Sequence, residues 1–289
     1  LHIPTACCSL GLDSYSFFRN AEPTGSLGGA ILIYQVTEAT APAWLVQCGT
    51  LDLPLRSEAI RAGFHEPETL RRLNIDCSEA WLYPGGDGEP GVYALAATTS
   101  GDEMSSGLFV RSHLATTRLS YEQPAGFILE PFSLYEREEP IPLPEDYSAG
   151  VAPATARPAT VSTTLGPRYS FEDMVEFLGI TSRYSQGQAE PTEITTWWRI
   201  LEVPEQQFSI MAHVVTSDGE LVNIGDALTV DQASLRPEDI LAQRHTFEME
   251  VNQTKRELWV RTGIYWLQSL DRWSVDDHEN SDAVFVRVQ

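Results

Sequence analysis

The apolar residues in the C-terminal half of the chain recur in short alternating runs that are separated by turn residues. In the run at 193–201, Ile194, Trp198 and Ile200 fall on one face, while Trp197 and Arg199 fall on the other. This period of two is typical of β-strands. Further runs at 174–180, 208–215, 220–224, 245–251 and 258–267 bring the prediction to about seven strands, with 235–241 as a bridge between two sheets. We expect an antiparallel β-sandwich of jelly-roll type.

The N-terminal half has a different pattern of apolar and polar residues. Strands are predicted at 30–36, 44–48, 80–83, 92–97, 107–111 and 127–135, with a Gly- and Pro-rich turn at 84–91. Residues 56–73 change to helical spacing, and Pro67 divides them into two short helices. The fold class is therefore mainly β. We predict a small α+β domain at 1–139, an extended linker at 140–167 that is rich in Pro, Ala and Thr, and the β-sandwich domain at 168–289.

Charge narrows the possible partners. The chain has 41 acidic against 19 basic residues, a net charge of -22, which repels nucleic acids and anionic lipid surfaces. No apolar run reaches the roughly 18 residues of a membrane span, so no membrane-spanning segment is predicted in this chain. The first residues do not form an intact signal peptide. A chain that starts at Leu1 is expected to continue upstream.

All four cysteines, Cys7, Cys8, Cys48 and Cys77, lie in the first 80 residues. Without a CxxC pair or a histidine at ligand spacing, they do not predict a zinc site, and we expect no cofactor. Their even number is compatible with disulfides in an oxidising compartment, with Cys48 and Cys77 as the first candidate pair. The alternative is that each is a reduced, buried thiol.

Four segments in a fixed order carry a resemblance: TTWWRIL (195–201), FSIMAHVVTSDGELV (208–222), GDALTV (225–230) followed by LRPEDILAQRH (235–245), and TGIYWLQSLDRW (262–273). They resemble the C-terminal extracytoplasmic β-domain of bacterial, Chloroflexi-like membrane glycosyltransferases of the dolichyl-phosphate-mannose protein mannosyltransferase type. The first domain is similar to the region before that sandwich through IDC (75–77), YPGGDGEPGVYAL (83–95) and FILEPFSLYERE (127–138).

The resemblance implies an extracytoplasmic location, tethered to the membrane by an upstream region, and an accessory role. Catalysis in that family uses acidic residues near N-terminal membrane helices. This chain lacks that region, so no catalytic residue is expected here. The implied function is to position acceptor or partner molecules. The alternative is a free-standing cell-surface module that binds carbohydrate or protein.

Few polar residues are candidates for catalysis or metal binding. His213 and His245 could approach each other across a sheet, but no GxSxG or HExxH pattern accompanies them, so we favour structural roles. A glycoside-active enzyme would need two facing carboxylates, and 41 acidic residues make chance pairs unavoidable. A weak calcium candidate follows Trp273, and the alternative for it is a solvated acidic loop; its members are Asp276, Asp277, Glu279 and Asp282.

Aromatic rings are the best candidates for a ligand site, because Trp and Tyr faces can stack on sugars. Strand alternation leaves one of Trp197 and Trp198, and one of Tyr265 and Trp266, outside the core. Such rings either bind a glycan or another surface protein, or merely cover a sheet edge or a seam between domains. The candidates are Trp197, Trp198, Trp259, Tyr265, Trp266 and Trp273. The sequon at Asn252 predicts a surface turn.

Overall fold

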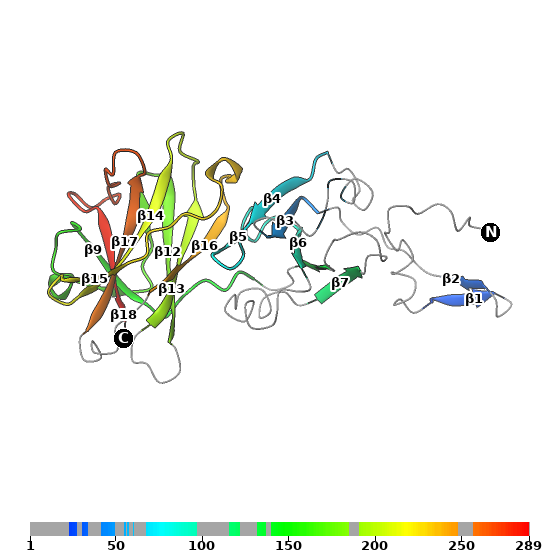
Figure 1. Cartoon of the computed structure of the whole chain (residues 1–289), viewed down its shortest axis with the longest axis horizontal. Helices are drawn as coiled ribbons and strands as arrows, with labels where there is room; N and C mark the ends of the chain where they lie inside the picture. Colours follow the sequence, from blue (N-terminus) through cyan, green and yellow to red (C-terminus); the bar gives the residue numbers. More distant parts are fainter. Residues whose placement is uncertain are drawn as a thin grey trace. The chain divides into compact units, whose positions relative to one another are not determined.

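The computed structural model describes residues 23–27, 31–33, 42–49, 55, 57, 60, 68–96, 116–121, 132–136, 140–184, 191–247 and 257–288. The chain forms two compact units, one within residues 1–75 and 89–140 and the other within 76–88 and 141–289. Within the described ranges, no helix has the length and apolar character needed to cross a membrane. The fold is mainly β, as predicted (Figure 1).

The first unit contains a five-stranded mixed sheet in the order β4-β3-β6-β8-β7. Strand β3 (Trp44–Cys48) pairs in parallel with β4 (Arg71–Ile75) and with β6 (Gly91–Ala96). Strand β8 (Phe132–Glu136) pairs antiparallel with β6 and with β7 (Thr116–Tyr121). A two-stranded sheet joins β1 (Gly25–Leu27) to β2 (Ile31–Ile33). The apolar core of the unit contains Leu45, Leu55, Ile60, Leu70, Val92 and Ala94.

The two helices expected at 56–73 are only partly supported. Ser57 and Ile60 have helical conformation. Residues 71–73, however, begin strand β4, so the prediction of a helix after Pro67 is wrong at these residues. Burial in β4 alternates, with Leu73 and Ile75 inside and Arg72 and Asn74 exposed. Parallel pairing with β3 thus overrides a spacing that also fits a helix. The strand predicted at 107–111 lies outside the described residues.

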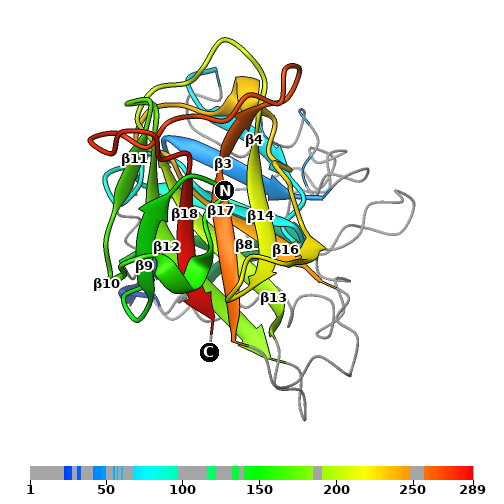
Figure 2. The ribbon, with the colours of Figure 1, turned by 90° about the vertical axis from the view of Figure 1, so that its left-hand side faces the viewer.

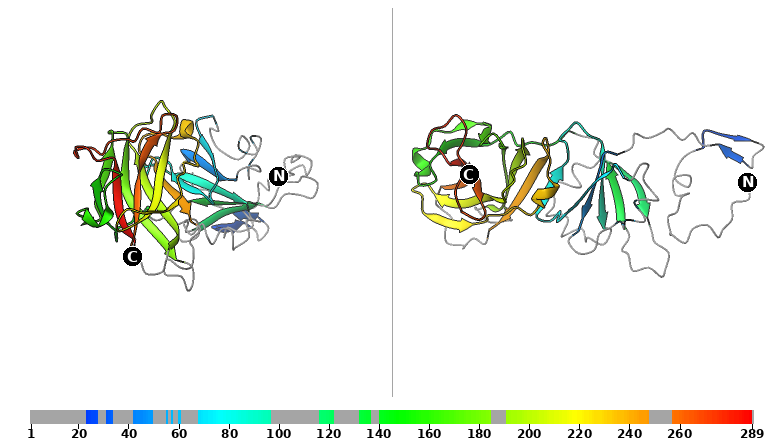
Figure 3. Two further views of the ribbon diagram at one scale, coloured as in Figure 1. Left: turned by 60° about the vertical axis from the view of Figure 1, so that its left-hand side comes forward. Right: turned by 90° about the horizontal axis from the view of Figure 1, so that it is seen from above.

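The second unit is an antiparallel β-sandwich, which confirms that part of the prediction. Its six-stranded sheet has the order β10 (Thr164–Leu165), β9 (Ser148–Ala152), β18 (Ala283–Val288), β17 (Leu258–Trp266), β14 (Phe208–Thr216) and β15 (Leu221–Ile224). The five-stranded sheet has the order β11 (Tyr169–Phe171), β12 (Val175–Tyr184), β13 (Pro191–Ile200), β16 (Ile240–Thr246) and β5 (Ala80–Tyr83). Figure 2 shows β9, β18, β17 and β14 as one layer, and Figure 3 shows both layers from two further directions.

The six-stranded sheet is covered on its second face as well. Met211, Val215, Trp259 and Phe285 form an apolar cluster with Ala154 and Ala283. Partly buried side chains from the 152–161 segment pack against it, including Ala156 and Val161, beside the short helix η1 (Pro158–Thr160). Simple in-out alternation therefore does not describe this sheet.

The linker predicted at 140–167 is wrong. This stretch contains β9, η1 and β10, and β9 pairs with β18 inside the sheet. Tyr147 and Ala149 are buried, although the segment has few large apolar residues. Small residues allow the tight packing: a Cβ on Gly150 would lie 2.1 Å from the carbonyl oxygen of Ser162. The sandwich unit accordingly resumes at residue 141 and not at 168.

Two further boundaries differ from the prediction. Strand β16 begins at Ile240 and ends at Thr246, so His245 lies near its end and not at its start. The expected bridge at 235–241 is therefore partly strand. Residues 76–88 belong to the sandwich, because β5 pairs with β16. The prediction from sequence had assigned the strand at 80–83 to the first domain.

Candidate functional site

Most of the aromatic candidates are buried. Trp197 and Trp198 both have 0% exposure, so the expectation that one of them lies outside the core is wrong. Trp197 stacks on Tyr83 of β5 with ring centroids 6.1 Å apart, and Trp198 contacts Phe171 and Phe177. Strand β13 is thus covered on both faces. These rings offer no open surface to a sugar.

The remaining candidate rings are also buried or half-buried. Trp259 and Trp273 are buried, while Tyr265 and Trp266 are both half-buried. Trp266 packs against Trp273 with ring centroids 4.6 Å apart. The predicted split into one buried and one exposed ring is wrong for Tyr265 and Trp266. Together, these residues do not form an exposed aromatic platform.

His245 lies within a chain of hydrogen bonds that runs from Trp198 to Gly225. The indole Nε1 of Trp198 donates to Oγ1 of Thr196 at 2.8 Å, and that hydroxyl lies 2.9 Å from Nε2 of His245. The other ring nitrogen, Nδ1, lies 2.5 Å from the carbonyl oxygen of Gly225. Since a carbonyl only accepts, Nδ1 carries the proton. Burial lowers the pKa of His245 to about 4, against smaller raising effects of the Gly225 hydrogen bond and of Asp226.

His213 lies in a second polar group on the other sheet. Its Nδ1 is 2.6 Å from Nη2 of Arg261, which only donates, and its Nε2 is 3.0 Å from the Asp226 carboxylate. Arg261 also donates to the carbonyl of Ala154. Burial alone would raise the pKa of Asp226, but hydrogen bonds from His213 and from the amide of Ala212 outweigh it and lower the pKa. Burial lowers the pKa of Arg261.

The two histidines are therefore in different sheets, and they do not form the pair that the sequence suggested. They are linked through adjacent residues, since Gly225 accepts from His245 and Asp226 contacts His213. Both ring nitrogens of each histidine are engaged by other groups of the protein. This arrangement holds the 225–226 segment to both sheets and leaves no ring nitrogen of these two residues free for a substrate.

The acidic residues after Trp273 do not gather into a metal site. In the described part of the chain, no group of three or more His, Cys, Asp or Glu side chains is placed to hold a metal ion. Asp276 accepts a hydrogen bond from the amide of Asp173, and Asp282 accepts one from the amide of Ala154. Asp277 and Glu279 are exposed. The carboxylates of Asp276 and Asp282 thus fix neighbouring loops.

The cysteines have a structural role where they are described. Cys48 and Cys77 are joined by a disulfide bond. Cys7 and Cys8, like the sequon at Asn252, lie outside the described residues.

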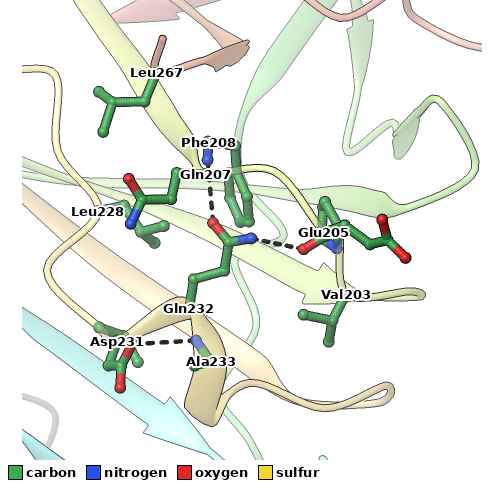
Figure 4. A pocket seen from close by; sticks show the side chains of 11 residues that line it. Val203, Glu205, Gln207, Phe208, Leu228, Asp231, Gln232, Ala233 and Leu267 are labelled. Atoms are coloured by element: carbon green, nitrogen blue, oxygen red, sulfur yellow. Dashed lines mark hydrogen bonds between the residues drawn. The ribbon is translucent and has the colours of Figure 1, made fainter.

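The described residues form a groove at one end of the sandwich, which sequence reasoning missed. Its volume is about 420 Å³, and we call it the end groove (Figure 4). Its lining comes from the loop between β13 and β14 with the start of β14, from the residues around the short helix η2 (Gln232–Ser234), and from Leu267, which follows β17. The lining residues are Val203, Pro204, Glu205, Gln207, Phe208, Leu228, Val230, Asp231, Gln232, Ala233 and Leu267.

Gln232 holds the end groove in shape. Its Nε2 donates to the carbonyls of Pro204 and Gln206 at 2.7 and 2.8 Å, and its Oε1 accepts from the amide of Phe208 at 3.1 Å. The amide of Leu267 donates to the carbonyl of Gln207, which ties the third segment to the first. Every wall is therefore fixed by hydrogen bonds within the protein. The groove is preformed, as small binding sites usually are.

The end groove combines an apolar floor with an acidic rim. Pro204, Phe208 and Val230 are buried beneath it, whereas Glu205 and Asp231 are exposed. In Figure 4, their carboxylates lie on opposite sides of the Gln232 side chain. No basic residue is among the described residues that line the groove. This chemistry suits an amphipathic cation.

A larger cleft of about 1100 Å³ lies near the end of β12. Its lining includes Glu145, Tyr147, Leu165, Ser182 and Arg287. Its charged groups are partly paired, since Arg287 lies 2.8 Å from Glu257. The end groove, whose walls Gln232 joins by three hydrogen bonds, is the better candidate for a preformed site.

Comparison with known proteins adds no relative. No family model matches the chain, and no curated protein or solved structure matches it.

Proposed function

We propose that this chain is a non-catalytic, extracytoplasmic region of a membrane glycosyltransferase-like protein, where it positions an acceptor or partner molecule. The observation that carries the proposal is the state of His213 and His245, which belong to the residue type best suited to proton transfer near neutral pH. All four of their ring nitrogens are engaged within the sandwich. The polar groups around these two histidines therefore support the structure of the domain.

Two other features support the proposal. The order of four sequence segments resembles the β-domain of that glycosyltransferase class. The disulfide between Cys48 and Cys77 is typical of proteins outside the reducing cytoplasm. The preformed end groove provides a place where a partner could be held.

The test uses cells that make the natural protein and an antibody raised against the sandwich. We expect the antibody to detect a membrane-bound product larger than the 32.1 kDa of this chain, which resists extraction with alkaline carbonate. Protease added to intact cells, or to spheroplasts where an outer wall blocks access, should destroy the epitope. A maleimide should label Cys48 and Cys77 only after reduction.

Two results would point elsewhere. An epitope that resists the added protease, together with labelling of Cys48 and Cys77 by the maleimide without reduction, would contradict an extracytoplasmic location. A protease-accessible product that carbonate releases would favour the alternative, a free-standing surface module that binds protein or carbohydrate.

A further inference from the structure

The end groove continues into an exposed apolar turn. Leu267 lines the groove and is 48% exposed, and Leu270 in the same turn is 68% exposed. The turn is fixed, because the amide of Leu270 donates to the carbonyl of Trp266 and the amide of Trp266 donates to the carbonyl of Asp271. Exposed leucines that are held rigidly next to a hollow form an apolar surface for a ligand longer than the groove itself.

The acidic rim selects the charge of that ligand. Among the described residues, Glu205 and Asp231 form no ion pair, although both are exposed. Asp231 accepts from the amide of Ala233, which fixes its carboxylate beside the groove. An anionic ligand would be repelled by these groups and by the net charge of -22. A cationic ligand meets a carboxylate on each side of an apolar floor.

The aromatic content of the groove argues for a polypeptide and against a glycan. Phe208 is the only aromatic residue among the described lining residues, and it is 2% exposed, so its face is not open for stacking on a sugar. An extended polypeptide, by contrast, can place one apolar side chain on the floor while its neighbours reach the rim.

We propose that the end groove binds an extended segment of a partner polypeptide in which one apolar side chain is flanked by two basic ones. The apolar side chain lies against Val203 and Leu228, which are half-buried in the lining of the groove, and the basic groups pair with Glu205 and Asp231. Further apolar residues of the segment contact Leu267 and Leu270. This inference rests on the proposed function, because it names the kind of partner that the sandwich positions.

The test measures binding of a fluorescein-labelled peptide to the whole chain by fluorescence anisotropy. The probe is Ser-Gly-Lys-Leu-Lys-Gly-Ser, and it is compared with peptides in which Ser replaces the Leu or Glu replaces both Lys. We expect saturable binding of the probe, at least tenfold weaker binding of the serine peptide, and no binding of the acidic one. Raising the salt concentration should weaken the interaction.

Variants separate the groove from the general negative charge of the protein. Glu205→Gln and Asp231→Asn should each weaken binding about threefold, and together about tenfold, as expected for exposed ion pairs. Asparagine retains the ability of residue 231 to accept from Ala233, so the fold should be unaffected. Glu279→Gln is the matched control, because Glu279 is exposed and does not line the groove.

Several results would overturn the inference. They are an absence of saturable binding, equal binding of the serine peptide, or an equal loss with Glu279→Gln. Each of these leaves the extracytoplasmic proposal standing, since that proposal is tested by protease accessibility and thiol labelling. Conversely, a cytoplasmic location combined with specific peptide binding would remove the proposed function and retain the site.

Discussion

His245 shows how one buried residue makes the stability of this domain depend on pH. It is 2% exposed, and its neutral form satisfies both Thr196 and Gly225. Burial lowers its pKa from 6.5 to about 4. The unfolded chain therefore binds more protons than the folded chain between these two values. His245 contributes stability that is fully present above pH 6.5 and is lost as the pH falls toward 4.

We predict that the free energy of unfolding falls between pH 7 and pH 5, with about 2 kcal/mol of the loss due to His245. Urea denaturation at the two pH values, followed by tryptophan fluorescence, measures it. His245→Gln should be less stable at pH 7 but should lose less stability on acidification. Identical pH dependence in the two proteins would show that His245 is not the responsible group.

Residue-scale features also mark the limit of sequence analysis. Alternation correctly separates the two sides of β13, but it does not show what covers each side. Trp198 meets Phe171 and Phe177, whereas Trp197 meets Tyr83, which is more than a hundred residues away in the sequence. The end groove was missed for a related reason. Its walls are loops without a motif, and only folding brings Glu205, Asp231 and Leu267 together.

At the scale of elements, the strands that the sequence predicted best are those bounded by turn residues. Strands β3 and β5 have the predicted bounds, and β5 is followed by the turn that begins at Pro84. Strand β9 was missed because SAGVA has little of the large apolar character that usually indicates a strand. It is stabilised by its place between β18 and β10, a tertiary property that local pattern does not contain.

This distinction between a strand and a linker predicts the effect of Ala149→Asp. Ala149 is 0% exposed and lies opposite Val286 of β18. A carboxylate at this position would be buried without a partner, so we expect a loss of about 3 kcal/mol or more in the free energy of unfolding. Ala159→Asp, at an exposed position in η1, should change it by less than about 0.5 kcal/mol. Urea denaturation compares them, and equal small effects would support the linker interpretation.

At the scale of the whole molecule, the sandwich is discontinuous in sequence. Residues 76–88 complete it, although residues 89–140 of the first unit follow them in the chain. More than strand pairing holds them there. The amide of Gly85 donates to Asp239 at 3.0 Å, Arg244 donates to the carbonyl of Ser78 at 2.8 Å, and Gln243 donates to the carbonyl of Glu79 at 3.0 Å. A boundary placed at residue 139 or 167 would therefore remove an edge strand from the sheet.

We predict that a fragment of residues 141–289 is less stable than the sandwich in the whole chain, and that a synthetic peptide of residues 76–88 restores it. In the native register Leu82 lies opposite Leu241 and Trp81 lies opposite Ala242, so the missing strand leaves buried apolar residues and the backbone of β16 exposed. The peptide carries Cys77→Ser to prevent oxidation. Because it binds only the folded fragment, it should raise the melting temperature in proportion to the logarithm of its concentration.

The same peptide with Leu82→Asp should have no effect, since Leu82 is 0% exposed. A fragment that melts with the whole chain and ignores the peptide would show that β5 is dispensable and that the sandwich begins at residue 141.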